Sequence, residues 1–295
     1  MARAAAAAEA DVAILKGAIT TIEGLQSQNG SGTPDVGAGF AVGEMLMKQA
    51  ADRLSSADPG PAWQGPAAIA YADQNDTQRH RVGIVAQLDA KMQELLEDEA
   101  RLVTGLRGRI AGILEGLAAA IPKAKALYAQ GPQGQAASIQ FQTDWAAWEL
   151  ESVNRDMRLM GAMAESNASL VNRWTGDYLE VSSMATVATP SASAMTPSTL
   201  EPRYLLGLAG AQAGASLELG KAAEATDGAD KEVAITHGET CAATATAVTA
   251  AVAARKAAIK SLQAVCMDRA KQLHFTAAKY EGTSADAADE LYGVL

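Results

Sequence analysis

The sequence predicts an all-α protein made of elongated helical hairpins that pack as a bundle. Alanine, the best helix former, is abundant among the 295 residues, and aromatic residues make up only 4%. The strict alternation of apolar and polar residues that is typical of half-buried strands is hard to find anywhere. Residues 67–121 contain no proline and carry apolar residues three or four positions apart, which predicts one long helix.

The N-terminal part is predicted to begin with two helices joined by a loop. Residues 4–25 place Ile14, Ile19 and other aliphatic side chains on one side of a helix. Residues 26–34, which read Gln-Ser-Gln-Asn-Gly-Ser-Gly-Thr-Pro, have the composition of a loop. A second helix, rich in methionine and alanine, is expected over residues 35–56.

A connection rich in proline and glycine follows, and the rest of the chain is organised around it. Residues 59–61, Pro-Gly-Pro, stop any helix that arrives from the N-terminal side. Gly65 can adopt a positive φ without steric cost, and Pro66 suits the first position of the next helix. We therefore expect residues 63–65, Trp-Gln-Gly, to form a tight connection between two helices, with the indole of Trp63 folded back between them.

The long helix carries its apolar residues in a narrow stripe with a single break at Glu99. The stripe consists of Val85, Leu88, Met92, Leu95, Leu102, Leu106, Ile110, Ile113 and Leu117. Glu99 belongs to an acidic cluster with Glu94, Glu97 and Asp98. A solvated helix face is the preferred interpretation of this cluster, over a site with paired carboxylates.

Glycine and proline occur in the second half of this helix and at its expected end. Four glycines three or four residues apart share one face, which predicts a close helix contact there: Gly105, Gly108, Gly112 and Gly116. Pro122 is expected to kink or end the helix, and residues 131–134, Gly-Pro-Gln-Gly, form a clear stop.

A further helix over residues 135–181 carries a stripe of aromatic and methionine side chains. Its members are Phe141, Trp145, Trp148, Met157, Met160, Trp174 and Tyr178. Packing against the preceding helices is the preferred interpretation of the stripe. An exposed surface for a partner is the alternative.

The C-terminal part repeats the plan of a shorter helix, a connection and a long helix. Residues 188–202 hold three prolines among Ser, Thr and Ala, so we expect an extended or mobile linker. Helices are expected over residues 204–226 and 239–281, with a loop over residues 227–238 between them. Gly282 is expected to end the long helix, and a short last helix to follow.

Charge and hydropathy argue against several classes of function. The net charge of −10 disfavours nucleic acid or an anionic membrane as the main partner. The sequence contains no stretch of about 20 apolar residues, so it predicts no transmembrane helix. Residues 1–8 are too short and too weakly hydrophobic for a convincing signal peptide. Cys241 and Cys266, if on one helix, lie about 37 Å apart, so no disulfide joins them.

No catalytic constellation emerges, so we predict no enzyme, no cofactor and no metal. His80 lies among polar residues and is expected to be solvated, and His274 is expected on a helix surface. His237 and Cys241 are four residues apart, a spacing that can place two metal ligands on one helix face. Two ligands without a third make a weak site, and His237 is expected to precede the helix.

Residues 35–127 resemble the EspA/EspE family of type VII (ESX) secretion-associated proteins. Trp63 and Gly65 match the WXG turn of ESX substrates, and residues 66–75, including Tyr71 and Asn75, match the start of the helix that follows this turn in the family. The resemblance implies a WXG/PPE-like helical fold for the N-terminal part.

Residues 205–295 resemble EspC over essentially the whole length of such a protein. The matching residues are Val-Ala-Ile-Thr-His-Gly at 233–238, Cys241 and a long helix that ends in Ala-Ala-Lys-Tyr at 277–280. The chain is therefore divided into an EspA/EspE-like domain over residues 1–187, a linker over residues 188–203 and an EspC-like helical domain over residues 204–295, and the two domains are expected to pack on one another.

The resemblance implies export by an actinobacterial type VII system and a structural or interaction role at or beyond the cell envelope. The partners that it implies are other ESX substrates or the secretion machinery, and homo-oligomers or filaments are possible. Tyr280 and Asp286 are the candidate export signal, although the family places its acid four residues after the tyrosine, where this chain has Ser284. A membrane-active helical effector is the alternative function, and membrane contact stays open.

Overall fold

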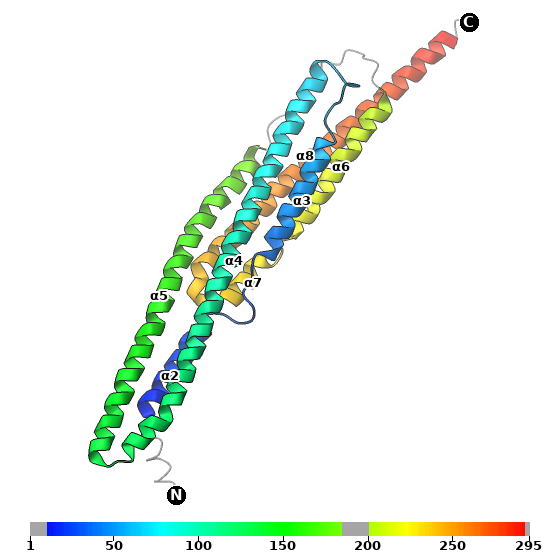
Figure 1. The fold of residues 1–295 in the computed structure, drawn as a ribbon. Coiled ribbons are helices and arrows are strands. Elements are labelled where there is room, and N and C mark those ends of the chain that lie inside the picture. The colour runs from blue at the N-terminus through cyan, green and yellow to red at the C-terminus, as the bar shows by residue number, and fades with distance from the viewer. Residues whose placement is uncertain (1–10, 185–200, 293–295) are drawn as a thin grey trace. The chain divides into compact units, whose positions relative to one another are not determined.

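The chain is almost entirely helical in the part that the structure, a computed structural model, describes. That part comprises residues 11–184 and 201–292, with the backbone alone for residues 283–292, and it contains no strand. The predicted all-α class is confirmed (Figure 1). The helices are α2 (Ala13–Ser27), α3 (Ala38–Ser55), α4 (Pro66–Tyr128), α5 (Pro132–Met184), α6 (Pro202–Glu224), α7 (Ala229–His237), the 3₁₀ turn η1 (Glu239–Cys241) and α8 (Ala242–Tyr292).

The helices form two compact units, and each unit takes segments from both ends of the chain. Unit 1 comprises Met1–Val36, Leu95–Leu170 and Asp230–Val248, and unit 2 comprises Gly37–Glu94, Val171–Ala229 and Thr249–Leu295. The helices α4, α5 and α8 contribute residues to both units. In each unit, segments from before and after the predicted linker therefore fold together, as we expected of the N-terminal and C-terminal parts. The domain division at residues 188–203 stays a prediction, and residues 185–200 lie outside the described part.

The core of unit 1 is a set of apolar side chains from α2, α4 and α5. They include Leu15, Ile22, Leu106, Ile110, Leu117, Val153 and Met160, all buried, together with Cys241 from η1. Burying an aliphatic side chain of this size contributes about 1.5–3 kcal/mol, so this cluster accounts for much of the stability of the unit.

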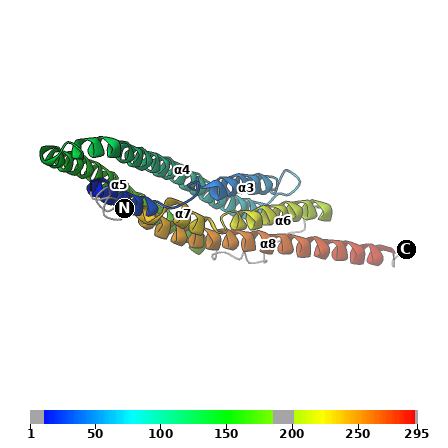
Figure 2. The same ribbon diagram turned by 90° about the horizontal axis from the view of Figure 1, so that it is seen from below.

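The core of unit 2 brings α3 and α6 together with parts of α4, α5 and α8. Its buried residues include Met47, Leu54, Val82, Val85, Tyr178, Leu219, Ile259 and Leu262. Figures 1 and 2 both show α3 lying alongside α6, and the two helices are in close contact. Gly39 permits this approach, because a Cβ there would lie within 3.3 Å of the Cα of Thr226.

Several predicted helix boundaries are wrong, and the errors share a physical cause. Most of the predicted loop at residues 227–238 is the helix α7, and α8 continues through Gly282 to Tyr292. A single glycine costs about 1 kcal/mol, too little to end a helix whose neighbours are good helix formers. Pro122 lies inside α4, which continues to Tyr128, so it does not end the helix; the kink that we gave as the other outcome stays a prediction.

The predicted close contact at the glycines of α4 is also wrong. An added Cβ at Gly108, Gly112 or Gly116 would meet no atom of the described chain within 4 Å, so these glycines face open space. Leu102, which we assigned to the buried stripe, is 39% exposed, whereas Val103 is buried. The stripe moves round the helix because a period of 3.5 residues drifts against the 3.6 residues of a straight helix turn.

Candidate functional site: contacts between the N-terminal and C-terminal parts

Trp63 lies in unit 2, in the connection of residues 56–65 between α3 and α4. Its side chain is 8% exposed. Gly65 has a φ of 100°, the conformation that glycine adopts at little cost, and Pro66 begins α4 as expected. The indole does not lie between α3 and α4. It packs instead with residues of α4, α6 and α8: Ala68, Leu205, Leu208, Ala209, Leu273 and Ala277.

Tyr71 and Asn75 form a polar cluster next to this indole. The rings of Trp63 and Tyr71 are 5.2 Å apart. The amide of the buried Asn75 donates to the Leu54 carbonyl at 2.7 Å, which ties α4 to the end of α3. Gln212 of α6 donates to the Asn75 amide oxygen at 2.9 Å and to the Tyr71 hydroxyl at 3.1 Å. Burial raises the pKa of Tyr71 to about 12, so its hydroxyl stays protonated at neutral pH.

The candidate export signal is only partly within the described residues. Tyr280 is half-buried and packs against the same cluster as Trp63 and Tyr71. Three of the aromatic residues that the family resemblance singled out therefore lie in one cluster. The side chain of Asp286 lies outside the described part.

Unit 1 holds a buried ion pair between Glu99 of α4 and His237 at the end of α7. His237 Nδ1 lies 2.8 Å from Glu99 Oε1, and His237 Nε2 lies 2.9 Å from the Asp35 carbonyl oxygen. Both side chains are fully buried. Both ring nitrogens face acceptors, so both hydrogen bonds form only when each nitrogen carries a hydrogen. The solvated face that we preferred for Glu99 is therefore wrong, because this carboxylate has partners inside the unit.

The second oxygen of Glu99 is also satisfied. It accepts hydrogen bonds from Asn167 at 2.6 Å and from Thr244 at 2.7 Å. Burial raises the pKa of Glu99, but the hydrogen bonds from its three neighbours outweigh burial and hold the pKa below its ordinary value. The carboxylate is thus a buried charge that is fully hydrogen-bonded, and removing a partner would leave it unsatisfied.

The backbone around His237 lies directly against the loop between α2 and α3. Ser31 N donates to the Ile235 carbonyl at 3.1 Å, and Thr240 N donates to the Gln28 carbonyl at 3.2 Å. Gly30 and Gly238 face each other at this point, and a Cβ on Gly30 would lie 2.7 Å from the Gly238 nitrogen. The two segments come this close because neither residue has a side chain.

Arg107 of α4 also links the loop between α2 and α3 to α7 through hydrogen bonds. Its guanidinium donates to the Asn29 carbonyl at 2.6 Å and 2.9 Å, and to the Gly32 carbonyl at 2.5 Å. It also donates to the Thr236 carbonyl. One side chain thus caps carbonyl groups from residues of the N-terminal loop and of α7.

Unit 2 contains a second buried ion pair, between Asp89 of α4 and Arg255 of α8. Both side chains are fully buried, and Arg255 Nε and Nη2 each donate to an oxygen of Asp89 at 2.7 Å. Tyr178 of α5 donates to Asp89 at 2.7 Å, and Arg255 Nη1 donates to the Ala222 carbonyl at 2.8 Å. Burial raises the pKa of Asp89, although these donors oppose it. We did not identify Arg255 or Asp89 from the sequence.

The remaining side-chain chemistry is sparse in the part of the chain that the structure describes. Cys241 and Cys266 are free and buried. Within residues 11–184 and 201–282, no group of three or more His, Cys, Asp or Glu residues is arranged to hold a metal ion. None of the described helices is both long and apolar enough to span a membrane.

Comparison with known families matches both ends of the chain. Residues 29–112 match the EspA/EspE family, and residues 195–293 match the family described as excreted virulence factor EspC, type VII ESX diderm. The resemblances that we inferred from the sequence are therefore confirmed. The loop that contacts α7 begins at the edge of the first matched segment, and α7 and α8 lie in the second. No solved structure matches the chain significantly.

Two curated relatives match part of the chain. The ESX-1 secretion-associated protein EspE of Mycobacterium tuberculosis is 37% identical over 78 residues, which cover 26% of this chain and 19% of EspE. The ESX-1 secretion-associated protein EspA of the same organism is 31% identical over 134 residues, which cover 45% of this chain and 34% of EspA. The chain therefore spans a fifth to a third of the length of these relatives.

Proposed function

We propose that this chain is a secreted substrate or accessory component of a type VII (ESX) secretion system, and that it acts as a structural or interaction protein at or beyond the cell envelope. One observation carries the proposal. Segments similar to EspA/EspE and to EspC occur in one chain and fold on each other in both units. Its partners would be other ESX substrates or the secretion machinery.

Joining the two segments in one chain favours their folding on each other. Two segments that are joined by a linker meet at an effective concentration in the millimolar range, and their stoichiometry is fixed at one to one. The buried pairs Glu99–His237 and Asp89–Arg255 each join a residue before the linker to one after it. Such pairs stabilise the structure only when both partners are in place. The two segments would therefore already be folded on each other when the chain reaches the secretion system.

Export itself is tested by immunoblotting culture filtrates. The chain is expressed in cells with a functional type VII ATPase and in matched cells without one, and a cytosolic protein serves as the lysis control. We expect the chain in the filtrate of the first cells only. Equal amounts in both filtrates, with the lysis control absent, would mean that another route exports it, and retention in both cells would mean that it is not a substrate.

We further propose that Tyr280 and the residues around Asp286 form the export signal. The support is that Tyr280, twelve residues before the end of α8, packs against the cluster that contains Trp63. Tyr280→Ala and a deletion of residues 286–295 should each lower export by at least tenfold. Phe275→Ala, which changes a side chain of α8 that is 71% exposed, is the matched control. Normal export of both variants would assign the signal to a co-exported partner.

A further inference from the structure

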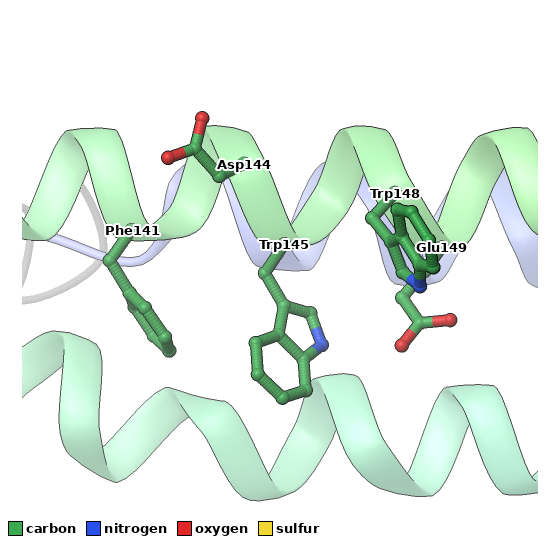
Figure 3. Close-up of a pocket in the computed structure, with 5 residues that line it drawn as sticks. All are labelled: Phe141, Asp144, Trp145, Trp148 and Glu149. Carbon is green, nitrogen blue, oxygen red and sulfur yellow. The ribbon is translucent and has the colours of Figure 1, made fainter.

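The helix α5 exposes large apolar side chains in unit 1, so the core packing that we preferred for Trp145 and Trp148 is wrong. Trp148 is 71% exposed and Trp145 is 40% exposed, whereas Met160 and Tyr178 are buried. Figure 3 shows Phe141 and Trp145 projecting from α5 toward α4, and both line a shallow groove with Trp148. Exposed apolar side chains can pack against many partners, whereas a buried charge is stable only beside a partner that neutralises it. The buried charges of the chain are therefore its most selective contacts.

Arg255 of α8 lies in a pocket of unit 2 that residues of the N-terminal part form. Asp89 accepts two hydrogen bonds from the guanidinium at 2.7 Å each, and Tyr178 donates to the same carboxylate. The ring of Phe40 lies 5.9 Å from the guanidinium carbon. Gly43 leaves room for the guanidinium, because a Cβ there would overlap Arg255 Nη2. We call these four residues of the N-terminal part, Phe40, Gly43, Asp89 and Tyr178, the arginine socket.

The contacts of the guanidinium suit arginine and not a cation in general. Besides the two bonds to Asp89, Arg255 Nη1 donates to the Ala222 carbonyl at 2.8 Å and to the Thr226 hydroxyl at 3.0 Å. The acceptors thus lie on different sides of a planar group whose donors form a fixed fork. A lysine ammonium is a point charge that cannot give two parallel hydrogen bonds to a carboxylate and also reach the other acceptors.

The residues of α8 that flank Arg255 do not by themselves fix which residue lies opposite Asp89. The buried residues Ala251, Ala254 and Ala258 are identical, so their packing changes little when the helix shifts along its axis. A shift of one helical turn would bring another α8 residue to Asp89 and leave both charges buried without a partner. A single buried polar residue fixes the register of paired helices in the same way.

A second polar contact between α4 and α8 keeps the same register. Gln78 Nε2 donates to Cys266 Sγ, and Arg269 donates to the Gln78 side-chain oxygen. Eleven residues separate Gln78 from Asp89 on α4, and eleven separate Arg255 from Cys266 on α8. The two contacts therefore belong to one antiparallel pairing of the helices in unit 2, which polar side chains mark at two points.

We propose that the arginine socket selects the partner of the EspA/EspE-like part, which binds an EspC-like part only where α8 places an arginine at the position of Arg255. Phe40, Gly43 and Asp89 lie in the first family match, and Arg255 lies in the second. An α8 without this arginine, or in another register, leaves the Asp89 carboxylate buried and unpaired, and is excluded for that reason. The proposal rests on the proposed function, in which the two segments act folded on each other. Its tests use purified protein, so their failure is distinct from a failure of export.

Urea unfolding of the full chain separates selection from stabilisation. Arg255→Met alone and Asp89→Leu alone should each lower the equilibrium constant for folding by about 100-fold or more, because each leaves a buried charge unpaired. Asp89→Leu, Tyr178→Phe and Arg255→Met together make the network apolar, and should restore the constant to within about tenfold of the wild type. A triple variant as unstable as the single variants would mean that the pair only stabilises the fold, which overturns the proposal.

Arg255→Lys tests whether the socket requires arginine or any cation. Lysine keeps the charge but loses the paired hydrogen bonds, so the equilibrium constant for folding should fall by about tenfold or more. Lys256→Arg is the matched control at the next position, since Lys256 makes a partly exposed ion pair with Asp227, and it should leave the constant unchanged. A lysine variant as stable as the wild type would contradict selection of an arginine.

Mixed refolding tests the selection directly. A specific protease site inserted at residue 190 allows the folded full chain to be cut between its two parts. Cut wild-type protein and the cut triple variant are mixed in denaturant, refolded together and analysed by native mass spectrometry. We expect matched pairs of fragments to outnumber mismatched pairs by about 30-fold or more. Cut Phe275→Ala protein, changed at an exposed position of α8, is the control and should exchange fragments evenly with the wild type. Equal amounts of matched and mismatched pairs, or no paired fragments at all, would overturn the proposal.

Discussion

The two units join the N-terminal and C-terminal parts of the chain with different chemistry. In unit 1 the contact is backbone against backbone at Gly30 and Gly238, and it is closed by the titratable pair Glu99–His237. In unit 2 the contact is made by side chains, chiefly the pair Asp89–Arg255 and the indole of Trp63. We therefore expect unit 1 to be destabilised by a methyl group added at Gly238 and by acid. We expect unit 2 to be destabilised by the loss of the Arg255 guanidinium or of the Trp63 indole.

The largest expected effect is the loss of Arg255. Arg255→Met leaves the Asp89 carboxylate buried without its cation, which should lower the free energy of unfolding by about 3–5 kcal/mol. Urea titration followed by circular dichroism measures it. Arg101→Met is the control, because Arg101 makes an exposed ion pair with Asp98, worth about 1 kcal/mol or less. Equal effects of the two variants would mean that the buried pair does not hold unit 2 together.

The next effect concerns Trp63. Trp63→Ala removes a buried indole and should cost about 3 kcal/mol, with a melting midpoint several degrees lower. Ile69→Ala is the control on the same segment, since Ile69 is 63% exposed, and it should leave the midpoint nearly unchanged. An unchanged midpoint for Trp63→Ala would favour a recognition role for the indole over a structural one.

Gly238→Ala tests the backbone contact of unit 1. Gly238 has a φ of 79° and touches the backbone of Gly30, so alanine brings both conformational strain and a collision, together about 2–3 kcal/mol. Gly228→Ala separates the two causes. Gly228 has a φ of 89°, and an added Cβ there meets no atom within 4 Å, so about 1 kcal/mol of strain is expected. Similar losses in the two variants would show that the glycine contact is not close.

The smallest expected effect is the pH dependence of unit 1. The pKa of Glu99 is lowered in the folded state, so its contribution to stability is present above its unfolded value, about 4.3, and is lost as the pH falls through the folded value. Glu99→Gln should flatten the slope of the free energy of unfolding against pH in that acidic range. An unchanged slope would mean that the pair with His237 does not stabilise the fold.

The pKa of Asp89 in unit 2 is shifted in the opposite direction to that of Glu99 in unit 1, so acid should affect the two units differently. Burial raises its pKa in the folded state, so its contribution to stability is present below the unfolded pKa, about 3.9, and is lost as the pH rises through the folded value. Mild acid should therefore lower the protection of backbone amides against hydrogen exchange near Val103 in unit 1 before it lowers the protection near Val85 in unit 2. Hydrogen exchange at pH 4 and pH 7 compares them, and greater loosening in unit 2 would contradict the two pKa shifts.

The sequence was sufficient to predict the fold class and the burial of Trp63, but not the α6 and α8 residues that cover its indole. Helix formers, few aromatics and a 3–4 apolar spacing predicted the helices, because local propensity and burial agree over most of the chain. The helix start at Pro66 and the burial of Trp63 followed from local rules for proline, glycine and aromatic residues. The helix α7, where we expected a loop, and the end of α8 did not, since packing outweighs a loop-like composition or a single glycine.

The buried ion pairs could not be predicted because their partners are far apart in the sequence. Glu99 interrupts an apolar stripe, which indicated an unusual position but not His237 as its partner. Arg255 lies among alanines with no local sign that distinguishes it from a solvated arginine. The exposure of Trp145 and Trp148 depends on where the neighbouring helices end, and residue spacing does not contain that information.

The central claim is that the two parts of the chain hold each other by contacts inside both units and not by the linker alone. It is tested most directly by inserting a specific protease site at residue 190, cleaving the folded protein, and applying it to a size-exclusion column at micromolar and lower concentrations. We expect the two fragments to co-elute in a ratio of one to one and to separate only in denaturant. Separate elution of the fragments under native conditions would contradict the claim.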